Sequence, residues 1–322
     1  MLKYLKKMNK CLYCNRELDS GEKDFHVKCA RKFFGISPAP ILDYTRADLD
    51  SLAMELIQAQ TTLTGVQPKI SLHLNEHKGG GLLTVVGLWG GFILKPQTEL
   101  FPYLPEVEQL TMCLADQFGI QTVPHSLIRM KDGELCFITR RIDRLPLGEK
   151  VPMEDLCQLS ERQTEYKYKS SYEQVAKVIR KYSCTPELDL TRYYELLIFC
   201  WLTGNNDMHL KNFALYNPTG EGFLLTPAYD LLNVALVNPA DQEELALTLN
   251  ARKKKVKTSD FVQAMQKANI PDKVITNIFH KFHQMVPKWL ETIHQSFLPK
   301  DYQEAYWQMV CDRLARINKK PV

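Results

Sequence analysis

The period of the apolar residues changes near the middle of the chain, and this change limits the folds open to it. Ile70, Leu72 and Leu74 alternate with polar residues, which is the pattern of a half-buried strand. After Met153 the apolar residues instead follow helical spacing, interrupted by one short β-like island at 213–226. The sequence therefore predicts an α+β protein with a small β-rich N-lobe followed by a larger α-helical C-lobe.

Individual elements and boundaries follow from the two patterns. Strands are expected over 70–74, 82–86 and 91–95, with a hairpin over 126–139. Helices are expected over 48–60, 106–118, 172–182 and 190–202, and from 259, 272 and 301 onward. The domain boundaries expected from composition are 1–36 for a Cys-rich block, 37–152 for the N-lobe and 153–322 for the C-lobe.

Composition excludes several classes of protein. The 322 residues correspond to about two domains or one two-lobed domain. A net charge of +4 and a pI near 8.4 are too weak for a dedicated nucleic-acid binder, so DNA contact is expected only through a partner. The most apolar stretch, 82–94, falls short of the roughly 18 residues that span a bilayer, and no membrane segment is expected. Nine cysteines without a secretory signal favour the reducing cytoplasm.

A metal site is predicted in the first block. Cys11, Cys14, His26 and Cys29 form two pairs of liganding side chains, and each pair can occupy one side of a tetrahedral ion. Three thiolates and an imidazole suit Zn²⁺. A block this small cannot bury enough apolar surface alone, so a metal would also explain how it folds. The alternative is that these are four structural residues without a ligand.

Polar residues with the chemistry of phosphoryl transfer follow the expected helix 190–202. Asp207 is a candidate base, Asn212 can coordinate a hard cation, and Lys211 between them can stabilise a phosphoryl group. Asp230 supplies a second carboxylate after a short strand, and oxygen ligands of this kind suit Mg²⁺. The alternatives are that Asp207 only forms a turn and that Asp230 only caps a helix.

The N-lobe supplies residues that could bind nucleotide. A loop that could cover phosphates lies before the first strand, although it matches neither GxGxxG nor a Walker A sequence. Its candidate contacts are Gly65, Val66, Gln67 and Lys69. Lys95 at a strand end and Glu108 on the next helix could form the lysine–glutamate pair of kinases, with Glu106 as a competitor for Glu108. The alternative is that Lys95 is a lysine at the surface end of a strand and that Glu108 is a solvated acid.

Five segments together resemble the HipA-type toxin kinases, which are bacterial serine/threonine kinases of toxin–antitoxin systems. The segments are Thr-Gly-Val-Gln-Pro-Lys (64–69), Ile-Leu-Lys-Pro (93–96), Glu-Asp-Leu-Cys-Gln (154–158), Asn-Asp-Met-His-Leu-Lys-Asn-Phe (206–213) and Pro-Ala-Tyr-Asp-Leu (227–231). The resemblance implies a two-lobed protein-kinase-like fold that uses ATP and Mg²⁺.

The resemblance also implies residue roles. Asp207 would be the base, with His209 and Lys211 beside it, while Asn212 and Asp230 would bind Mg²⁺. Lys95 would bind phosphates. Glu154, Asp155 and Leu156 would form the hinge near adenine. Related kinases carry hydroxyl residues in the phosphate loop, so autophosphorylation is expected at Thr62, Thr64 or both.

Partners are likewise implied by the resemblance. They are a helix-turn-helix antitoxin that binds DNA, and a protein substrate related to translation, such as an aminoacyl-tRNA synthetase. Only about 60 residues precede the phosphate loop, which is similar to the shorter HipT-type kinases and suggests a small companion protein for the missing subdomain. Two alternatives stay open: a kinase-derived binding scaffold acting with the antitoxin, and a small-molecule kinase. The basic run at 252–257 is expected to be a solvated loop rather than a docking patch.

Overall fold

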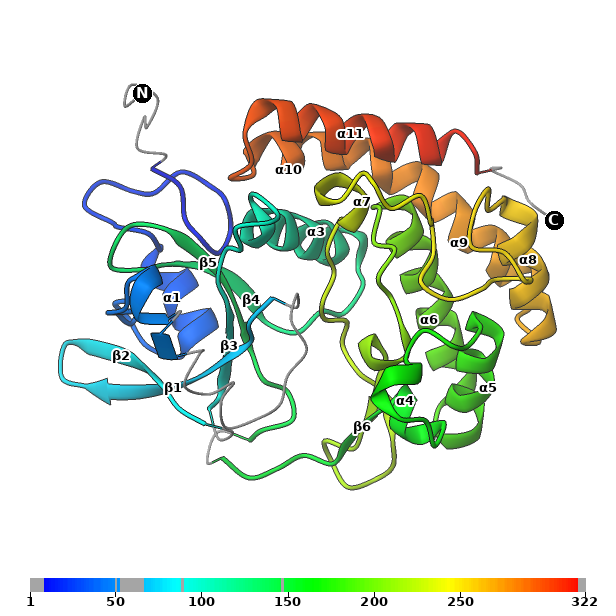
Figure 1. Cartoon of the computed structure of the whole chain (residues 1–322), viewed down its shortest axis with the longest axis horizontal. Helices are drawn as coiled ribbons and strands as arrows, with labels where there is room; N and C mark the ends of the chain where they lie inside the picture. The colour runs from blue at the N-terminus through cyan, green and yellow to red at the C-terminus, as the bar shows by residue number, and fades with distance from the viewer. Residues whose placement is uncertain (1–8, 50, 53–66, 88–89, 146–147, 318–322) are drawn as a thin grey trace. The chain divides into compact units, whose positions relative to one another are not determined.

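The computed structural model of the chain describes residues 9–49, 51–52, 67–87, 90–145 and 148–317. The chain divides into two compact units. The first comprises Met1–Gln109, Val123–Glu149 and Gln295–Phe297, and the second comprises Leu110–Thr122, Lys150–His294 and Leu298–Val322. The first unit contains an antiparallel sheet, and the second consists mainly of helices (Figure 1).

The first unit contains a five-stranded antiparallel sheet in the order β2-β1-β3-β5-β4. Its strands are β1 (Ile70–His77), β2 (Gly80–Val85), β3 (Phe92–Lys95), β4 (His125–Arg129) and β5 (Leu135–Arg140). Ile70 and Leu72 are buried and lie opposite Leu94 and Phe92, which explains the alternating pattern in the sequence. The expected strands and hairpin are therefore present, and β1 continues three residues further, to His77.

The Cys-rich block contains a helix that the sequence pattern did not indicate. Helix α1 (Val27–Phe34) ends at Gly35, whose φ of 83° closes the helix in the left-handed conformation. Its buried face includes Phe33 and Phe34. The centroids of both rings lie 5.9 Å from the centroid of the Phe92 ring in β3. The apolar residues of the block and of the sheet thus form one hydrophobic cluster.

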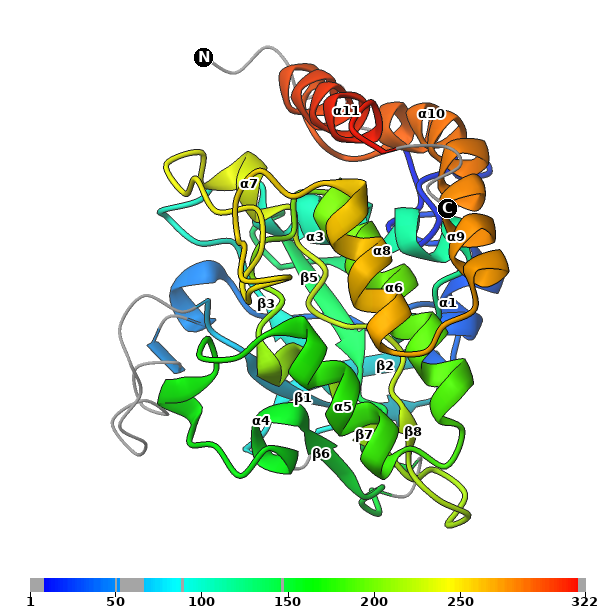
Figure 2. The ribbon, with the colours of Figure 1, turned by 90° about the vertical axis from the view of Figure 1, so that its right-hand side faces the viewer.

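The second unit consists mainly of helices and also contains a small sheet (Figure 2). Its helices are α4 (Leu156–Leu159), α5 (Tyr172–Tyr182), α6 (Pro186–Leu202), α7 (Val234–Val237), α8 (Thr258–Lys267), α9 (Asp272–Met285) and α11 (Lys300–Leu314), together with α10 (Trp289–Gln295) except for its last residue. The short 3-10 helices are Thr164–Tyr166, Leu210–Asn212 and Val286–Lys288. Helix α6 is buried nearly all round and contacts α5, α8 and α11, so it forms the centre of this unit. Helix α3 (Leu104–Phe118) begins in the first unit and ends in the second.

The main difference from the sequence prediction concerns residues 153–155. They form strand β6 (Met153–Asp155), which pairs with β7 (Ala214–Tyr216), and β7 pairs in turn with β8 (Leu224–Leu225). Three residues are too few to show a period, so this strand could not be read from the sequence. Most of the expected helix 48–60 lies outside the described residues. No helix in the described part of the chain has both the length and the apolar character needed to cross a membrane.

Candidate functional site

The segment with the candidate base begins at the end of α6. Gly204 follows this helix with a φ of 78°. A Cβ atom at this position would lie 2.2 Å from Oδ1 of Asn233 and 2.7 Å from Sδ of Met309. Only glycine fits both the backbone conformation and this close approach, so it fixes the direction in which the chain enters the candidate loop.

Asn205 connects the two segments that carry the candidate carboxylates. Its side chain is 2% exposed, and its Nδ2 donates to the carbonyl oxygen of Asp230 at 3.3 Å. Its Oδ1 accepts a hydrogen bond from the backbone N–H of Asp207, also at 3.3 Å. One buried amide therefore binds the backbone of both segments. Asn205 could not be identified from the sequence, because a loop asparagine gives no sign of its long-range partner.

Asn212 is oriented by the same loop. Its Nδ2 donates to the carbonyl oxygen of Asp207 at 2.9 Å, which leaves the amide oxygen as the atom that can coordinate a cation. Asp230 has a φ of 55°, a conformation that is unfavourable for a non-glycine residue and is often found at functional sites. Asn212 and Asp230 both offer oxygen atoms, the type of ligand that Mg²⁺ prefers.

Tyr168 contacts the candidate base directly and was not identified from the sequence. Its hydroxyl donates a 2.6 Å hydrogen bond to Oδ1 of the half-buried Asp207. Burial, together with this hydrogen bond to the carboxylate, raises the pKa of the Tyr168 hydroxyl well above its usual range, so the hydroxyl keeps its proton. The carboxylate of Asp207 is thereby restrained through one oxygen.

His209 packs beside this pair. Its ring lies edge-on to the ring of Tyr168, with 5.0 Å between the ring centroids. Burial lowers the pKa of His209 to about 4, although Asp207 opposes the shift. The imidazole is therefore neutral near pH 7, and its position favours a role in packing rather than as a charged group.

Lys211 forms an ion pair with the segment that was predicted as the hinge. Its Nζ lies 2.7 Å from Oδ2 of Asp155. Oδ1 of Asp155 accepts a hydrogen bond from the backbone N–H of Gln158 at 2.9 Å and caps α4. The backbone N–H of Leu156 donates to the carbonyl oxygen of Phe213 at 2.9 Å. Residues 154–156 therefore lie against the end of the candidate loop, within the second unit.

The first unit contains a buried lysine–glutamate pair. Nζ of Lys95 lies 2.5 Å from Oε1 of Glu108, and the two residues are 6% and 2% exposed. Glu106, the competing acid, is half-buried, and desolvation raises the pKa of its carboxyl to about 7. The structure thus pairs Lys95 with Glu108.

In the loop before β1, Nε2 of Gln67 donates to the carbonyl oxygen of Pro96 at 2.8 Å and Lys69 is exposed. Thr62, Thr64, Gly65 and Val66 lie outside the described residues.

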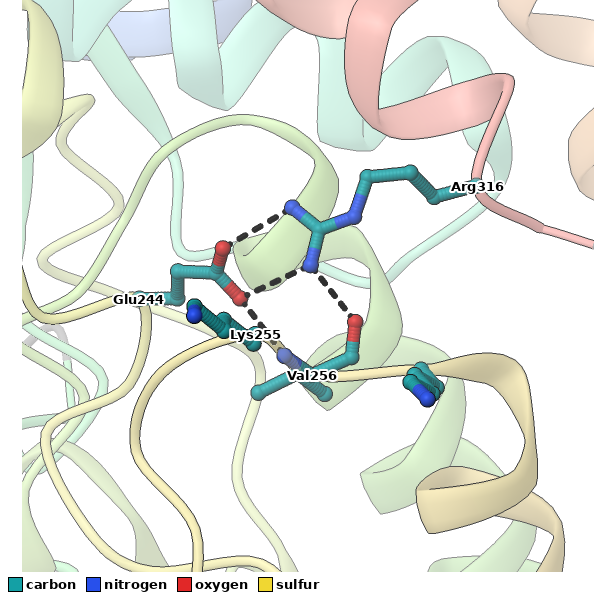
Figure 3. Close-up of a pocket in the computed structure, with 5 residues that line it drawn as sticks. Glu244, Lys255, Val256 and Arg316 are labelled. Atoms are coloured by element: carbon teal, nitrogen blue, oxygen red, sulfur yellow. Dashed lines mark hydrogen bonds and ion pairs between the residues drawn. The ribbon is translucent and has the colours of Figure 1, made fainter.

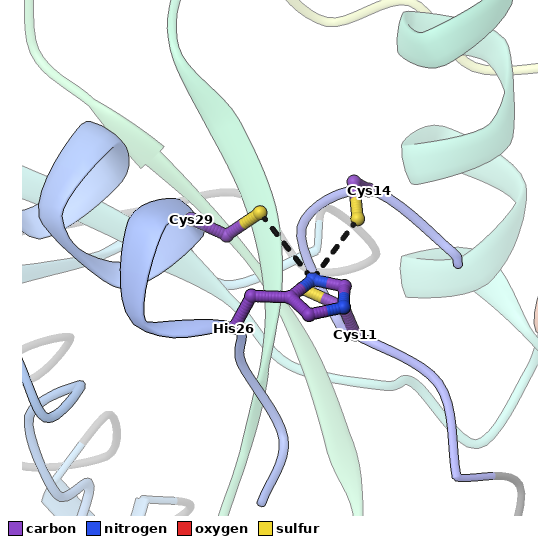
Figure 4. Close-up of side chains that lie close together, drawn as sticks. All are labelled: Cys11, Cys14, His26 and Cys29. Carbon is purple, nitrogen blue, oxygen red and sulfur yellow. Dashed lines mark hydrogen bonds between the residues drawn. The ribbon is translucent and has the colours of Figure 1, made fainter. Parts of the chain in front are cut away.

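The four side chains of the predicted zinc site come together in the first unit (Figure 4). The three sulfur atoms and one imidazole nitrogen of Cys11, Cys14, His26 and Cys29 all lie within 4.8 Å of one another. Cys11, His26 and Cys29 are buried. All nine cysteines of the chain are thiols. The arrangement satisfies the spatial requirement for binding one metal ion with four ligands.

Two pockets of the second unit lie apart from the candidate base. One, of about 450 Å³, is bordered by Glu244, Val256 and Arg316 together with two lysines of the basic run (Figure 3). Arg316 donates to both carboxylate oxygens of Glu244 at 2.8 and 3.2 Å, and Glu244 also accepts from the N–H of Val256 at 2.9 Å. These bonds connect a long loop to the chain after α11, which gives the residues a structural role. The other pocket, of about 660 Å³, lies between α5 and α8.

Comparison with protein families identifies the larger part of the chain. Residues 61–290 match the family described as the HipA-like C-terminal domain. Y4dM of Sinorhizobium fredii (strain NBRC 101917 / NGR234) is 29% identical in an alignment of 228 residues that covers 66% of this chain and 55% of Y4dM. A protein of Haemophilus influenzae (strain ATCC 51907 / DSM 11121 / KW20 / Rd) is 24% identical in an alignment of 306 residues that covers 87% of this chain and 88% of that protein. The name of each of these two proteins describes it as an inferred kinase. The chain thus spans about half the length of Y4dM.

Solved structures show the same fold. The toxin–antitoxin complex of Shewanella oneidensis MR-1, which contains HipA, HipB and operator DNA, includes a chain that matches with a TM-score of 0.68 at 19% identity. This match covers 88% of the present chain and 74% of that chain. The Helicobacter pylori proinflammatory kinase CtkA matches with a TM-score of 0.53 at 14% identity, over 78% and 96% of the two chains. Since the family match covers most of the sequence, this protein belongs to the HipA-like kinase family.

Proposed function

We propose that this protein is an ATP- and Mg²⁺-dependent serine/threonine protein kinase. The observation that carries the proposal is that one buried amide, Asn205, binds the backbone of both Asp207 and Asp230. In the proposed reaction, Asp207 orients the hydroxyl of a serine or threonine and accepts its proton as the oxygen attacks the γ-phosphorus of ATP. The bond from this phosphorus to the β,γ-bridging oxygen breaks at the same time, and ADP leaves. Tyr168 occupies one oxygen of Asp207, which leaves the other oxygen to accept this proton.

Asn212 and Asp230 fit a Mg²⁺ site. The amide of Asn212 is held by its nitrogen, so its oxygen is presented for coordination, and the carboxylate of Asp230 supplies a negative charge. Bound Mg²⁺ would supply positive charge to the phosphate oxygens of ATP. His209 is proposed to position the loop by packing against Tyr168 as a neutral ring.

The buried pair of Lys95 and Glu108 supports a nucleotide site in the first unit. Burying two charges contributes little to stability, because the loss of hydration offsets the attraction between them. A functional reason for the pair is that Glu108 holds the ammonium of Lys95 ready for the phosphates of ATP. Gly65, Val66, Gln67 and Lys69 are proposed to cover these phosphates.

Residues 154–156 are proposed to lie near the adenine ring. Strand β6 is at the edge of its three-stranded sheet, so one side of its backbone is not used in the strand pairing. The N–H groups of Asp155 and Leu156 already donate to Gln158 and Phe213, and the backbone of Glu154 faces Leu215 in β7. Contact with adenine would therefore fall to the side chain of Glu154 and to the carbonyl oxygen of Asp155. Lys211 would exchange Asp155 for a phosphate oxygen when ATP binds.

We further propose that the protein is the toxin of a bacterial toxin–antitoxin system in the cytoplasm. The support is the fold shared with a chain of the HipA–HipB–operator complex. The expected partners are a helix-turn-helix antitoxin, through which the protein would contact DNA, and a small companion protein as in HipT-type systems. The expected substrate is a protein of translation such as an aminoacyl-tRNA synthetase. The kinase is also proposed to phosphorylate its own Thr62, Thr64 or both.

The substitution Asp207→Asn tests this function. The amide keeps the shape of the loop but cannot act as the base, so phosphoryl transfer should fall by about 10²- to 10⁴-fold. Growth arrest on expression should disappear with it. The control is Asp301→Asn, since Asp301 is exposed in the first turn of α11.

Toxicity that persists in Asp207→Asn would support a binding scaffold. Loss of toxicity without any phosphorylated protein in a phosphoproteome comparison would support a small-molecule kinase.

A further inference from the structure

We propose that Cys11, Cys14, His26 and Cys29 bind one Zn²⁺, and that this centre fastens the N-terminal segment to the sheet that carries Lys95. The proposal does not depend on the kinase reaction, because it concerns the first unit alone. It rests on the separations of the ligand atoms, on the hydrogen bond that orients His26, and on the contacts made by the residues between the ligands.

The separations of the ligand atoms match a tetrahedral zinc centre. Zn–S bonds of about 2.3 Å and Zn–N bonds of about 2.0–2.1 Å place a sulfur and a nitrogen roughly 3.5 Å apart in a tetrahedron. Nδ1 of His26 lies 3.5 Å from Sγ of Cys14 and 3.6 Å from Sγ of Cys29. In Figure 4 the sulfur atoms of Cys14 and Cys29 point toward the same ring nitrogen, and the ligand atom of Cys11 lies within 4.8 Å of the other three.

A backbone carbonyl selects the nitrogen of His26 that faces the sulfurs. Nε2 lies 2.8 Å from the carbonyl oxygen of Glu17, which can only accept a hydrogen bond. Nε2 therefore carries the hydrogen in the neutral ring, and Nδ1 presents its lone pair to the cysteines. Metal-binding histidines commonly use their second nitrogen in this way.

Other uses of the four side chains explain less. A disulfide would join two of the sulfurs, but it gives no reason for an imidazole nitrogen to approach Cys14 and Cys29 equally. Buried thiols acting only as small apolar residues would not need a lone pair of His26 directed at them. A metal ion accounts for all four groups, and for the burial of three of the four residues.

The two residues between Cys11 and Cys14 contact the sheet and α3. The carbonyl oxygen of Leu12 accepts hydrogen bonds from the backbone N–H of Leu127 and from Oγ of Ser126, both at 3.2 Å. These residues belong to β4, an edge strand of the sheet, whose outer backbone groups would otherwise lack a strand partner. The carbonyl oxygen of Tyr13 accepts from Nε2 of Gln109 at 3.4 Å, next to Glu108 on α3.

The fourth ligand lies on a helix that packs against β3. Cys29 belongs to α1, and the rings of Phe33 and Phe34 on this helix contact Phe92 at the start of β3. The same strand ends with Lys95. The guanidinium of Arg140 in β5 donates to the carbonyl oxygen of Phe33. Loss of the metal should therefore release contacts to three strands and to the turn of α3 that carries Glu108.

Metal content tests the ligand set. The purified full-length protein should contain one zinc per chain by inductively coupled plasma mass spectrometry. After exchange with Co²⁺ it should show the thiolate charge-transfer and tetrahedral d–d absorption bands. His26→Ala should lower zinc affinity by about 100-fold or more, whereas His26→Cys should retain the metal because four thiolates also bind zinc. Cys184→Ser, at an exposed cysteine outside the cluster, should have no effect. A wild-type protein that neither contains zinc nor shows the cobalt bands would disprove the site.

Hydrogen exchange tests the fastening role in the same full-length protein. Removing zinc with a chelator should accelerate hydrogen exchange of the Leu127 amide by about tenfold or more, because this amide would lose its hydrogen bond to the carbonyl oxygen of Leu12. The amide of Phe199, a buried residue of α6 in the second unit, serves as the control and should not change. If zinc leaves and the Leu127 amide stays equally protected, the centre does not fasten this segment to the sheet.

Discussion

At the scale of single residues, Tyr168 restrains the proposed base. Its hydroxyl is 2.6 Å from Oδ1 of Asp207, and a hydrogen bond to a charged acceptor contributes about 1.5–3 kcal/mol. We expect Tyr168→Phe to lower kcat for phosphoryl transfer by about tenfold, since 1.4 kcal/mol corresponds to a tenfold change. The KM for ATP should stay the same, because Tyr168 is not among the proposed ATP contacts.

Tyr166 provides the matched control for this experiment. It lies two residues earlier and is exposed to a similar degree, with 40% of its surface exposed against 42% for Tyr168. Tyr166→Phe should leave kcat unchanged. A melting temperature that falls in Tyr168→Phe together with an unchanged kcat would show that the contact with Asp207 is only structural.

Glu106 and Glu108 should respond oppositely to neutralisation. Burial raises the pKa of Glu106 to about 7, so the folded state holds this proton more tightly than the unfolded state does. Below about pH 4.5 the carboxyl of Glu106 is neutral in both states, and its burial does not lower the free energy of unfolding. This free energy falls as the pH rises through 7, because the buried carboxyl then loses its proton. Glu106→Gln should raise the free energy of unfolding by about 1–3 kcal/mol at pH 8 and change it little at pH 4.

Glu108→Gln is the counterpart of this substitution. It would leave the buried ammonium of Lys95 without its charged partner, and breaking a buried pair typically costs about 3–5 kcal/mol. Urea denaturation of both variants at the two pH values measures the difference. Equal effects of the two substitutions at pH 8 would contradict the separate roles given to these acids.

At the scale of elements, the turn after α6 depends on Gly204. Both Gly204 and Gly220 have a positive φ, of 78° and 82°, but only Gly204 has neighbours in the space of a Cβ atom. Gly220→Ala should therefore cost only the left-handed conformation, about 1–2 kcal/mol. Gly204→Ala should cost about 1–3 kcal/mol more, because it also displaces Asn233. Thermal unfolding of the two variants measures this difference, and equal losses would show that the side chain of Asn233 moves away freely.

The same turn connects the stability of the second unit to the proposed reaction. Gly204 determines the direction of the chain between the end of α6 and Asn205, and Asn205 binds the backbone of both Asp207 and Asp230. A displaced turn would therefore alter the candidate base and one candidate Mg²⁺ ligand together. Of the short strands that follow, β7 pairs with β6 and β8 pairs with β7.

At the scale of the whole molecule, we expect regulation through the loop before β1. Each phosphate on Thr62 or Thr64 would add about −1.5 to −2 charges beside the phosphates of ATP, and repulsion should then exclude the nucleotide. Intact-mass spectrometry should detect added phosphate in the wild-type protein and none in Asp207→Asn. The double substitution of both threonines by Ala should keep ATP binding, and the double substitution by Asp should abolish it. Active wild-type protein without phosphate on either residue would refute this regulation.

The sequence determined the periodic elements and the residue types of both candidate sites. The alternation from Ile70 onward corresponds to β1, and the helical spacing predicted after Met153 corresponds to the helices of the second unit, apart from β6. Periods of two and 3.6 residues are local properties of the chain, so they are visible without any tertiary contact. The spacing of Cys11, Cys14, His26 and Cys29 likewise predicted a cluster, and their side chains come together.

Only the tertiary structure decided which residues meet across long separations. Tyr168 and Asp207 are 39 positions apart, and Leu12 meets Ser126 across 114 positions. Lys95 meets Glu108 rather than Glu106, because residues two apart on a helix point in different directions and only the packing of α3 fixes which one faces the strand. A polar side chain has no period that indicates its partner, since the folding of the whole chain determines which distant donor and acceptor become neighbours.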